Sequence, residues 1–263
     1  LGTDQWAETF KTAMRTILKS RKQRPLDAIV IAIRHDITGE LGRQRIEKLE
    51  ILGANFGTLL KDVQAISGYR LPVYLLIAQT DTDPGFHSLS QLAKRSEDDT
   101  PVMGWSSPYH VEESFDQQWV DQAIAKIVDS ANFMVLSGIS NAGEEADTEH
   151  APFLLRSVAS IRDLTKPLKA FLGSMLRTTD YTEPAIFRGV FLTGGCVEDD
   201  IAEAAFTETL FAAKIFPETG LAQPLKGRMA REEKRIFHLK LATATTAIIG
   251  SIALVFLLIN DYS

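Results

Sequence analysis

Residues Leu71–Phe86 read LPVYLLIAQTDTDPGF, an apolar run that ends in small polar residues and is stopped by Pro84 and Gly85. A short apolar run bounded by turn residues predicts a buried strand over Leu71–Ala78. Ligands of open α/β sheets bind at the carboxyl ends of the strands, so the strand delivers Asp81 to such an edge. Either Asp81 contacts a ligand there, as the base-reading carboxylate of GTP-binding proteins does, or it only caps the strand.

Two other apolar runs indicate the rest of the sheet. Leu26–Ile33 (LDAIVIAI) predicts a second buried strand, and helical spacing over Gly42–Ser67 predicts a long helix after it. Phe187–Leu192 predicts a third strand, followed by Thr193–Gly194–Gly195. Strand, helix and strand in this order form a right-handed crossover between parallel strands. The sequence therefore predicts an α/β fold with part of a doubly wound parallel sheet.

The remaining segments are mostly helical by their apolar spacing. Pro167 is expected to kink or divide one of these helices, because proline lacks the N–H that a helix interior needs. A polar, acidic loop is expected over Asn141–His150. The predicted helices are Trp6–Lys19, Trp119–Val135, Phe153–Leu176 and Ile201–Ile215.

Composition excludes several classes of protein. The chain has 263 residues and a formal net charge of −6, which argues against a nucleic-acid-binding protein with a basic face. One cysteine, Cys196, rules out an internal disulfide framework and a CxxC-type zinc site. The acidic residues of the 141–150 loop are interpreted as solvated charges rather than as metal ligands.

Leu241–Ile259 is an uncharged run of 19 residues, LATATTAIIGSIALVFLLI. Because a helix rises about 1.5 Å per residue, about 20 apolar residues cross the hydrocarbon core of a bilayer. We expect this run to be a transmembrane helix, with Leu241, Ile248, Ile249, Leu254 and Ile259 among its membrane-spanning residues. A basic helix precedes it, and basic flanks stay in the cytoplasm. Its cations are Lys226, Arg228, Arg231, Lys234, Arg235 and Lys240.

An acyl hydrolase is the enzyme class with a recognisable motif. Gly138–Ala142 (GISNA) imitates the G-x-S-x-G turn that carries a nucleophilic serine, here Ser140. That turn needs a strand before the serine and a helix directly after it. The run before Ser140 is helical by its spacing and an acidic loop follows it, so the hydrolase interpretation is not favoured.

Several segments together resemble the IcmF/TssM family, the inner-membrane components of type VI secretion systems and of the related Dot/Icm type IVB apparatus. They are RPLDAIVIAI, LPVYLLIAQTD followed by PGF, the pair Gly104–Trp105, RGVFLTGG, and FPETGLAQP shortly before the expected membrane helix. The resemblance covers about Trp6 to Ile259 and keeps the motifs in the family's order. Family members carry a P-loop GTPase-like cytoplasmic domain, followed by a membrane helix and a periplasmic region.

The resemblance implies a division of the chain into four parts. Residues 1–110 correspond to the latter part of the GTPase-like α/β domain. Residues 111–225 form a helical insert or subdomain that includes a returning strand near 187–193. Residues 226–240 are a basic juxtamembrane helix, and residues 241–259 are the transmembrane helix.

The resemblance also raises the question of a nucleotide. The phosphate-binding loop G-x-x-x-x-G-K-[ST] is absent from this sequence, and in the family it lies upstream of the segment that this chain matches. Asp81 and Gln79 stand where the family often has T-K-x-D, and Thr193 and Gly194 stand where the last base-contacting loop would be. We therefore expect no cofactor in this chain, with GTP or ATP and Mg²⁺ as the alternative in a longer parent.

The function implied by the resemblance is that of an interaction protein rather than an enzyme. We expect a scaffold in a multi-subunit complex at the bacterial inner membrane, with residues 1–240 in the cytoplasm and the C-terminus toward the periplasm. The implied partners are a DotU/TssL-type membrane protein, other membrane and baseplate components of the machine, and the lipid bilayer. The alternative is a nucleotide-binding switch domain.

Overall fold

The structure, a computed structural model, describes residues 3–21, 26–38, 43–95, 102–142, 151–178, 183–198 and 201–261. The chain divides into two compact units, Leu1–Gln223 and Pro224–Ser263. β8 (Gln223–Pro224) lies at the boundary between the units. Most of the expected acidic loop, residues 143–150, lies outside the described residues.

The first unit is built on a four-stranded sheet in the order β1-β3-β5-β4. β1 (Ile29–Arg34), β3 (Pro72–Ala78) and β5 (Ile186–Leu192) are parallel, with Ile31 opposite Leu75 and Leu75 opposite Val190. These strands confirm the three that the sequence predicts, and their direction confirms the parallel sheet. The P-loop character of the fold stays a prediction.

The fourth strand is one that the sequence analysis did not predict. β4 (Gly104–Ser106) pairs antiparallel with β5 at the edge of the sheet. Gly104 makes this pairing possible, because a Cβ atom at that position would lie 2.2 Å from Cδ1 of Phe191 and 2.7 Å from the oxygen of Val190. A three-residue strand has too little periodicity to stand out in a sequence.

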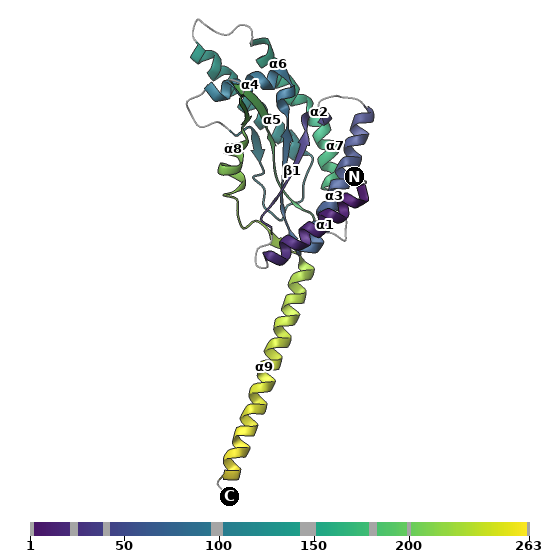
Figure 1. Cartoon of the computed structure of the whole chain (residues 1–263), viewed down its shortest axis with the longest axis vertical. Helices are drawn as coiled ribbons and strands as arrows, with labels where there is room; N and C mark the ends of the chain where they lie inside the picture. Colours follow the sequence, from purple (N-terminus) through teal and green to yellow (C-terminus); the bar gives the residue numbers. More distant parts are fainter. Residues whose placement is uncertain are drawn as a thin grey trace. The chain divides into compact units, whose positions relative to one another are not determined.

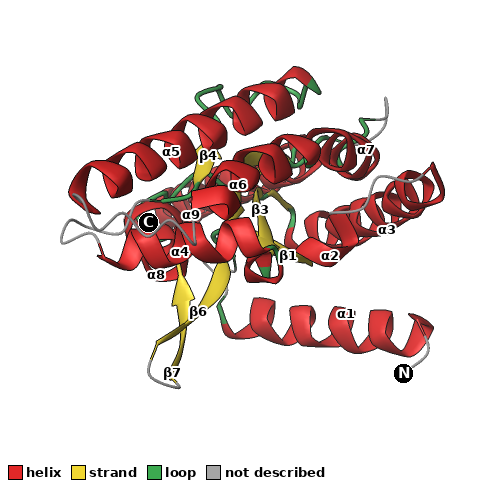
Figure 2. Ribbon diagram, turned by 90° about the horizontal axis from the view of Figure 1, so that it is seen from above, coloured by secondary structure: helices red, strands yellow, loops and turns green. Residues whose placement is uncertain are grey.

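Helices pack around the sheet as Figures 1 and 2 show. α3 (Arg43–Ser67) is the predicted crossover helix between β1 and β3, with the two-residue strand β2 (Tyr69–Arg70) just before β3. The predicted helix over 153–176 is divided at Leu164, and Pro167 lies in the first turn of the second half, where its missing N–H costs little. The other helices before residue 180 are α1 (Thr3–Ser20), α2 (His35–Thr38), α4 (Pro84–Arg95), α5 (Gln118–Ala142), α6 (Ala151–Asp163) and α7 (Thr165–Met175).

α3 and α7 lie side by side in both views and approach each other very closely (Figures 1 and 2). A Cβ atom on Gly53 would lie 2.3 Å from the oxygen of Phe171, and one on Gly57 would lie 2.6 Å from the oxygen of Met175. The two glycines are four residues apart and so share one face of α3. Their lack of a side chain lets the two backbones meet.

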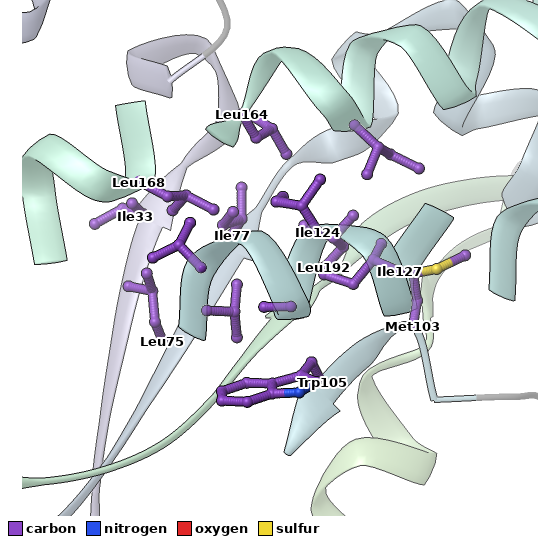
Figure 3. Close-up of a cluster of buried hydrophobic side chains, with 14 of the residues drawn as sticks. Ile33, Leu75, Ile77, Met103, Trp105, Ile124, Ile127, Leu164, Leu168 and Leu192 are labelled. Carbon is purple, nitrogen blue, oxygen red and sulfur yellow. The ribbon is translucent and has the colours of Figure 1, made fainter. Parts of the chain in front are cut away.

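The main core lies between one face of the sheet and helices α3 to α7. Alternate residues of a strand point to opposite faces, and Val73, Leu75 and Ile77 of β3 point to this one. Figure 3 shows Ile33, Leu75 and Ile77 in one cluster with Ile124 and Ile127 of α5 and with Leu164 and Leu168.

A smaller cluster of buried side chains covers the other face of the sheet. Tyr74, Leu76 and Phe191 pack there against Leu210 and Ile215, which come from α8 (Thr207–Leu210) and the π-helical turn η3 (Phe211–Ile215). α8 lies across the sheet from α3 and α7 (Figure 1).

A polar contact fixes the segment that follows η3. The Tyr74 hydroxyl and the Arg188 Nε both donate to Oε2 of Glu218, at 2.7 and 3.1 Å. Burial and the Glu218 carboxylate raise the pKa of Tyr74 well above its ordinary value. Glu218 therefore ties the residues before the second unit to two central strands of the sheet.

The predicted helix over Ile201–Ile215 is wrong in its first third. β7 (Ile201–Ala205) is a strand that pairs antiparallel with β6 (Gly194–Glu198), and the hairpin projects from the unit in Figure 2. The sequence IAEAA is rich in helix-forming residues, but pairing with a neighbouring strand overrides such preferences. The two glycines of the predicted Thr193–Gly194–Gly195 turn are therefore the first two residues of β6.

The second unit is dominated by one helix, α9 (Lys226–Asp261), of 36 residues. The predicted basic helix over 226–240 is confirmed as a helix. Among the described residues, no helix combines the length and the apolar character needed to cross a membrane. The structure thus does not confirm the span expected over Leu241–Ile259, of which residues 249 and 251–259 have side chains outside the described part.

Candidate functional site

The carboxyl ends of β3 and β5 meet where the sequence analysis expected a site. The Thr193 N–H donates to the oxygen of Ile77 at 2.9 Å, which carries the ladder to the end of both strands. β3 then stops at Gln79, an exposed residue in the left-handed conformation, with φ of 59°. The short 3-10 turn η1 (Thr80–Thr82) follows and turns Asp81 toward the start of β6.

Asp81 is held by the backbone of the neighbouring strand. Its Oδ1 accepts a hydrogen bond of 2.7 Å from the Gly195 N–H. A Cβ atom on Gly194 would lie 2.8 Å from Oγ1 of Thr80 and 2.9 Å from the nitrogen of Asp81. Gly194 therefore has to be small so that η1 can pack against the start of β6.

Thr80 makes a second link between the same two segments. Its side chain is buried, and its Oγ1 donates to the oxygen of Thr193 at 2.8 Å. The Thr80 N–H donates to the same oxygen at 3.2 Å. Two donors on one buried carbonyl fix the spacing of the strand ends.

Asp83 joins this edge to two helices. Its Oδ1 accepts from the N–H groups of Gly85 and Phe86, which caps the start of α4. Its Oδ2 accepts from the Ser160 hydroxyl of α6 at 2.8 Å. All the side-chain hydrogen bonds described for Asp83 are made inside the protein.

A small pocket lined by both polar and apolar side chains lies beside these groups. His35, Thr80, Asp83 and Ser160 line its polar part, and its volume of about 10 Å³ is room for about one water molecule. Burial lowers the pKa of His35, against the attraction of the Asp83, Asp36 and Asp81 carboxylates, which raises it.

The predicted site residues are thus partly brought together. Asp81, Thr193 and Gly194 are neighbours, as predicted from the shared edge of the sheet, whereas the Gln79 side chain is exposed. Thr80, Asp83 and Ser160 were not identified from the sequence. The Asp83–Pro84 pair, a helix-start signal, could have revealed the cap, but no motif points to Ser160.

A metal site and a nucleophilic serine are the two interpretations that the sequence did not favour. Within the described residues, no group of three or more His, Cys, Asp or Glu side chains could hold a metal ion. Ser140 lies inside helix α5 and not at a strand-to-helix turn, so the geometry of a nucleophilic serine is missing.

The residues expected at a membrane lie on α9. Leu241 and Ile248 are 56% and 59% exposed, while the side chains of Ile249, Leu254 and Ile259 lie outside the described part. Of the predicted cations, Lys226, Lys234, Arg235 and Lys240 are exposed, and the side chains of Arg228 and Arg231 are outside the description.

The sequence matches the IcmF-related N-terminal domain over residues 4–245. This match covers most of the chain, including the sheet, the carboxyl edge and the first half of α9. The chain belongs to the IcmF-related family. Neither the comparison with curated proteins nor that with solved structures gives a match.

Membership confirms the resemblance found in the sequence. IcmF family proteins are membrane-associated and belong to multi-subunit complexes of type VI or type IVB secretion. In this IcmF-related domain, the polar residues at the carboxyl edge of the sheet form hydrogen bonds to other groups of the protein.

Proposed function

We propose that this chain is a cytoplasmic scaffold domain of a secretion machine at the bacterial inner membrane, where it docks a DotU/TssL-type membrane protein. The observation that carries the proposal is the family match over residues 4–245. Other membrane and baseplate components of the same machine would bind the same platform.

The hydrogen bonding at the carboxyl edge of the sheet supports a scaffold role. Asp81, Thr80 and Asp83 all bond to groups of the protein itself. A scaffold needs strand ends that hold their positions, and these bonds supply that rigidity. The closely packed α3–α7 pair adds a second rigid element.

Attachment to the membrane is the second part of the proposal. Every described side chain of α9 from Glu233 to Ile248 is exposed, including large apolar ones such as Leu241 and Ile248. The run 241–259 has no charged residue, and cations precede it. Lipid would cover these side chains, with the cationic side in the cytoplasm and the C-terminus toward the periplasm.

Binding of the partner tests the proposal directly. Membrane vesicles that contain the full chain should retain the purified cytoplasmic domain of a DotU/TssL-type protein, and vesicles without the chain should not. Washing the vesicles at alkaline pH should leave the chain in the membrane fraction. Failure to retain the partner would contradict the docking role, and release by the wash would contradict the anchor.

A nucleotide-binding switch is the alternative, and one observation favours it. Asp81 lies beside Thr193 and Gly194 at the edge of a parallel sheet, which is where a guanine base would be read. To bind a base through Asp81, the protein would have to release the bond to Gly195. Equilibrium binding of labelled GTP to a longer form that includes the phosphate loop decides the question, with Asp81→Asn as the control variant.

A further inference from the structure

The first turns of α9 carry their cations unevenly around the helix. Residues spaced i, i+3, i+4 and i+7 lie on one face, and Arg231, Lys234, Arg235 and His238 have this spacing. Lys226 and Lys240 are fourteen residues apart and lie on the other side of the helix. We call the four positions 231, 234, 235 and 238 the basic face.

Few acidic residues have helical spacing to the basic face. Arg231 and Arg235 are an i,i+4 pair, a spacing at which like charges repel. The residues three and four positions after Glu233 are Ile236 and Phe237, which are not part of the basic face. Glu232 lies three positions before Arg235 and has helical spacing to no other member of the face. In the part of the chain that the structure describes, Lys234 and Arg235 form no ion pair. Lys234 and Arg235 are exposed, so an anion outside the chain can reach them.

The position of the basic face points to one source of anions. The uncharged run starts at Leu241, so His238, Arg235 and Lys234 lie about 4 to 10 Å before it along the axis. The polar layer of a bilayer extends about 5 to 8 Å beyond the hydrocarbon core on each side. Long cationic side chains at this depth reach the phosphate groups of lipids.

We propose that the basic face is a binding site for the phosphate groups of anionic phospholipids. The inference rests on the membrane anchoring in the proposed function, and it adds that one side of α9, and not net charge alone, selects the lipid. Arg235 and Lys234 donate hydrogen bonds to phosphate oxygens, with the ring of His238 as a further donor. A bound phosphate also relieves the repulsion between the cations at positions 231 and 235.

The test compares two single variants of the full chain that each remove one positive charge near the uncharged run. Arg235→Gln changes the basic face, whereas Lys240→Gln changes the opposite side of the helix. Native mass spectrometry of the detergent-solubilised chain, titrated with phosphatidylglycerol or phosphatidylcholine, gives the affinity for each lipid. Circular dichroism checks that both variants keep the helix.

We expect the wild type to prefer phosphatidylglycerol, the basic-face variant to bind it about five- to tenfold more weakly, and the opposite-side variant to stay within about twofold of the wild type. An equal loss in both variants, or no preference for phosphatidylglycerol, overturns the proposal. Displacement of the lipid by millimolar inorganic phosphate also overturns it, because the site would then be one for free phosphate. The alkaline wash of vesicles reports on anchoring separately, so failure of the anchor and failure of the lipid site are distinguishable.

Discussion

The polar side chains at the two ends of the central sheet differ in how fully they are hydrogen-bonded. At the carboxyl end, Asp81, Thr80 and Asp83 bond to the backbone and to Ser160. At the amino end, the buried Arg70 is also bonded, but the Nε2 atom of the buried Gln64 has no partner among the described residues. A position at the carboxyl edge therefore does not by itself indicate a free ligand-binding group.

Arg70 organises the amino end. It is 4% exposed, and its guanidinium donates to the oxygens of Pro184 and Val111 at 2.9 and 3.1 Å and to Glu112 at 3.3 Å. Gln64 lies nearby on α3, in a small pocket lined also by Lys61, Arg177 and Pro184. At the amino end, one buried cation, Arg70, thus joins several segments, whereas at the carboxyl end several hydrogen bonds join segments that are far apart in the sequence.

Replacing Arg70 should have the largest effect. Arg70→Met removes a buried guanidinium and leaves two backbone oxygens without their donor, so we expect the free energy of unfolding to fall by about 3 kcal/mol. Urea unfolding of the chain measures this. Glu112→Gln is the control, because the Glu112 side chain is 58% exposed and should contribute less than about 1 kcal/mol. Equal losses in both variants would contradict the role given to Arg70.

Gly194→Ala tests the packing of the carboxyl end. The added methyl group would lie 2.8 Å from Oγ1 of Thr80, so η1 has to shift away, and we expect a loss of about 2 kcal/mol. Gly195→Ala is the matched control, since its closest contact would be 3.3 Å from Oδ2 of Asp81. The same urea unfolding measurement ranks both variants. A Gly194→Ala variant as stable as the wild type would show that the edge is loosely packed.

Gln64→Leu should stabilise the protein. The variant keeps a similar volume and removes a buried amide nitrogen that has no hydrogen-bond partner among the described residues, so we expect a gain of about 1 kcal/mol. Gln64→Glu provides the contrast, because a buried charge would destabilise the same position. If Gln64→Leu destabilises the protein, the Gln64 amide is hydrogen-bonded in solution and the difference between the two ends disappears.

Asp81→Asn should change stability least. An asparagine oxygen can still accept the Gly195 N–H, so we expect a change of less than about 0.5 kcal/mol, whereas Asp81→Ala should cost about 1 kcal/mol. Unfolding curves of the two variants measure the difference. If Asp81→Ala is also neutral, the bond to Gly195 is not what keeps Asp81 in place.

The sequence predicted the parts of the fold that have strong local patterns. The buried runs at Ile31, Leu75 and Val190 identified three parallel strands, and their shared carboxyl edge placed Asp81 beside Thr193. β4 and the β6–β7 hairpin were missed because short strands owe their structure to distant partners. Ser160 reaches the edge from a helix 77 residues away in the sequence, and only the folded chain brings it there.

Partner binding with and without nucleotide tests the central claim, that the carboxyl edge is structural and that the domain acts by binding another protein. A longer form of the protein that includes the phosphate loop is placed in lipid nanodiscs and titrated with the cytoplasmic domain of a DotU/TssL-type protein, as wild type and as Asp81→Asn, with and without GTP. We predict one affinity in all four titrations. Binding that requires GTP and is lost in Asp81→Asn would contradict the claim and identify a nucleotide switch.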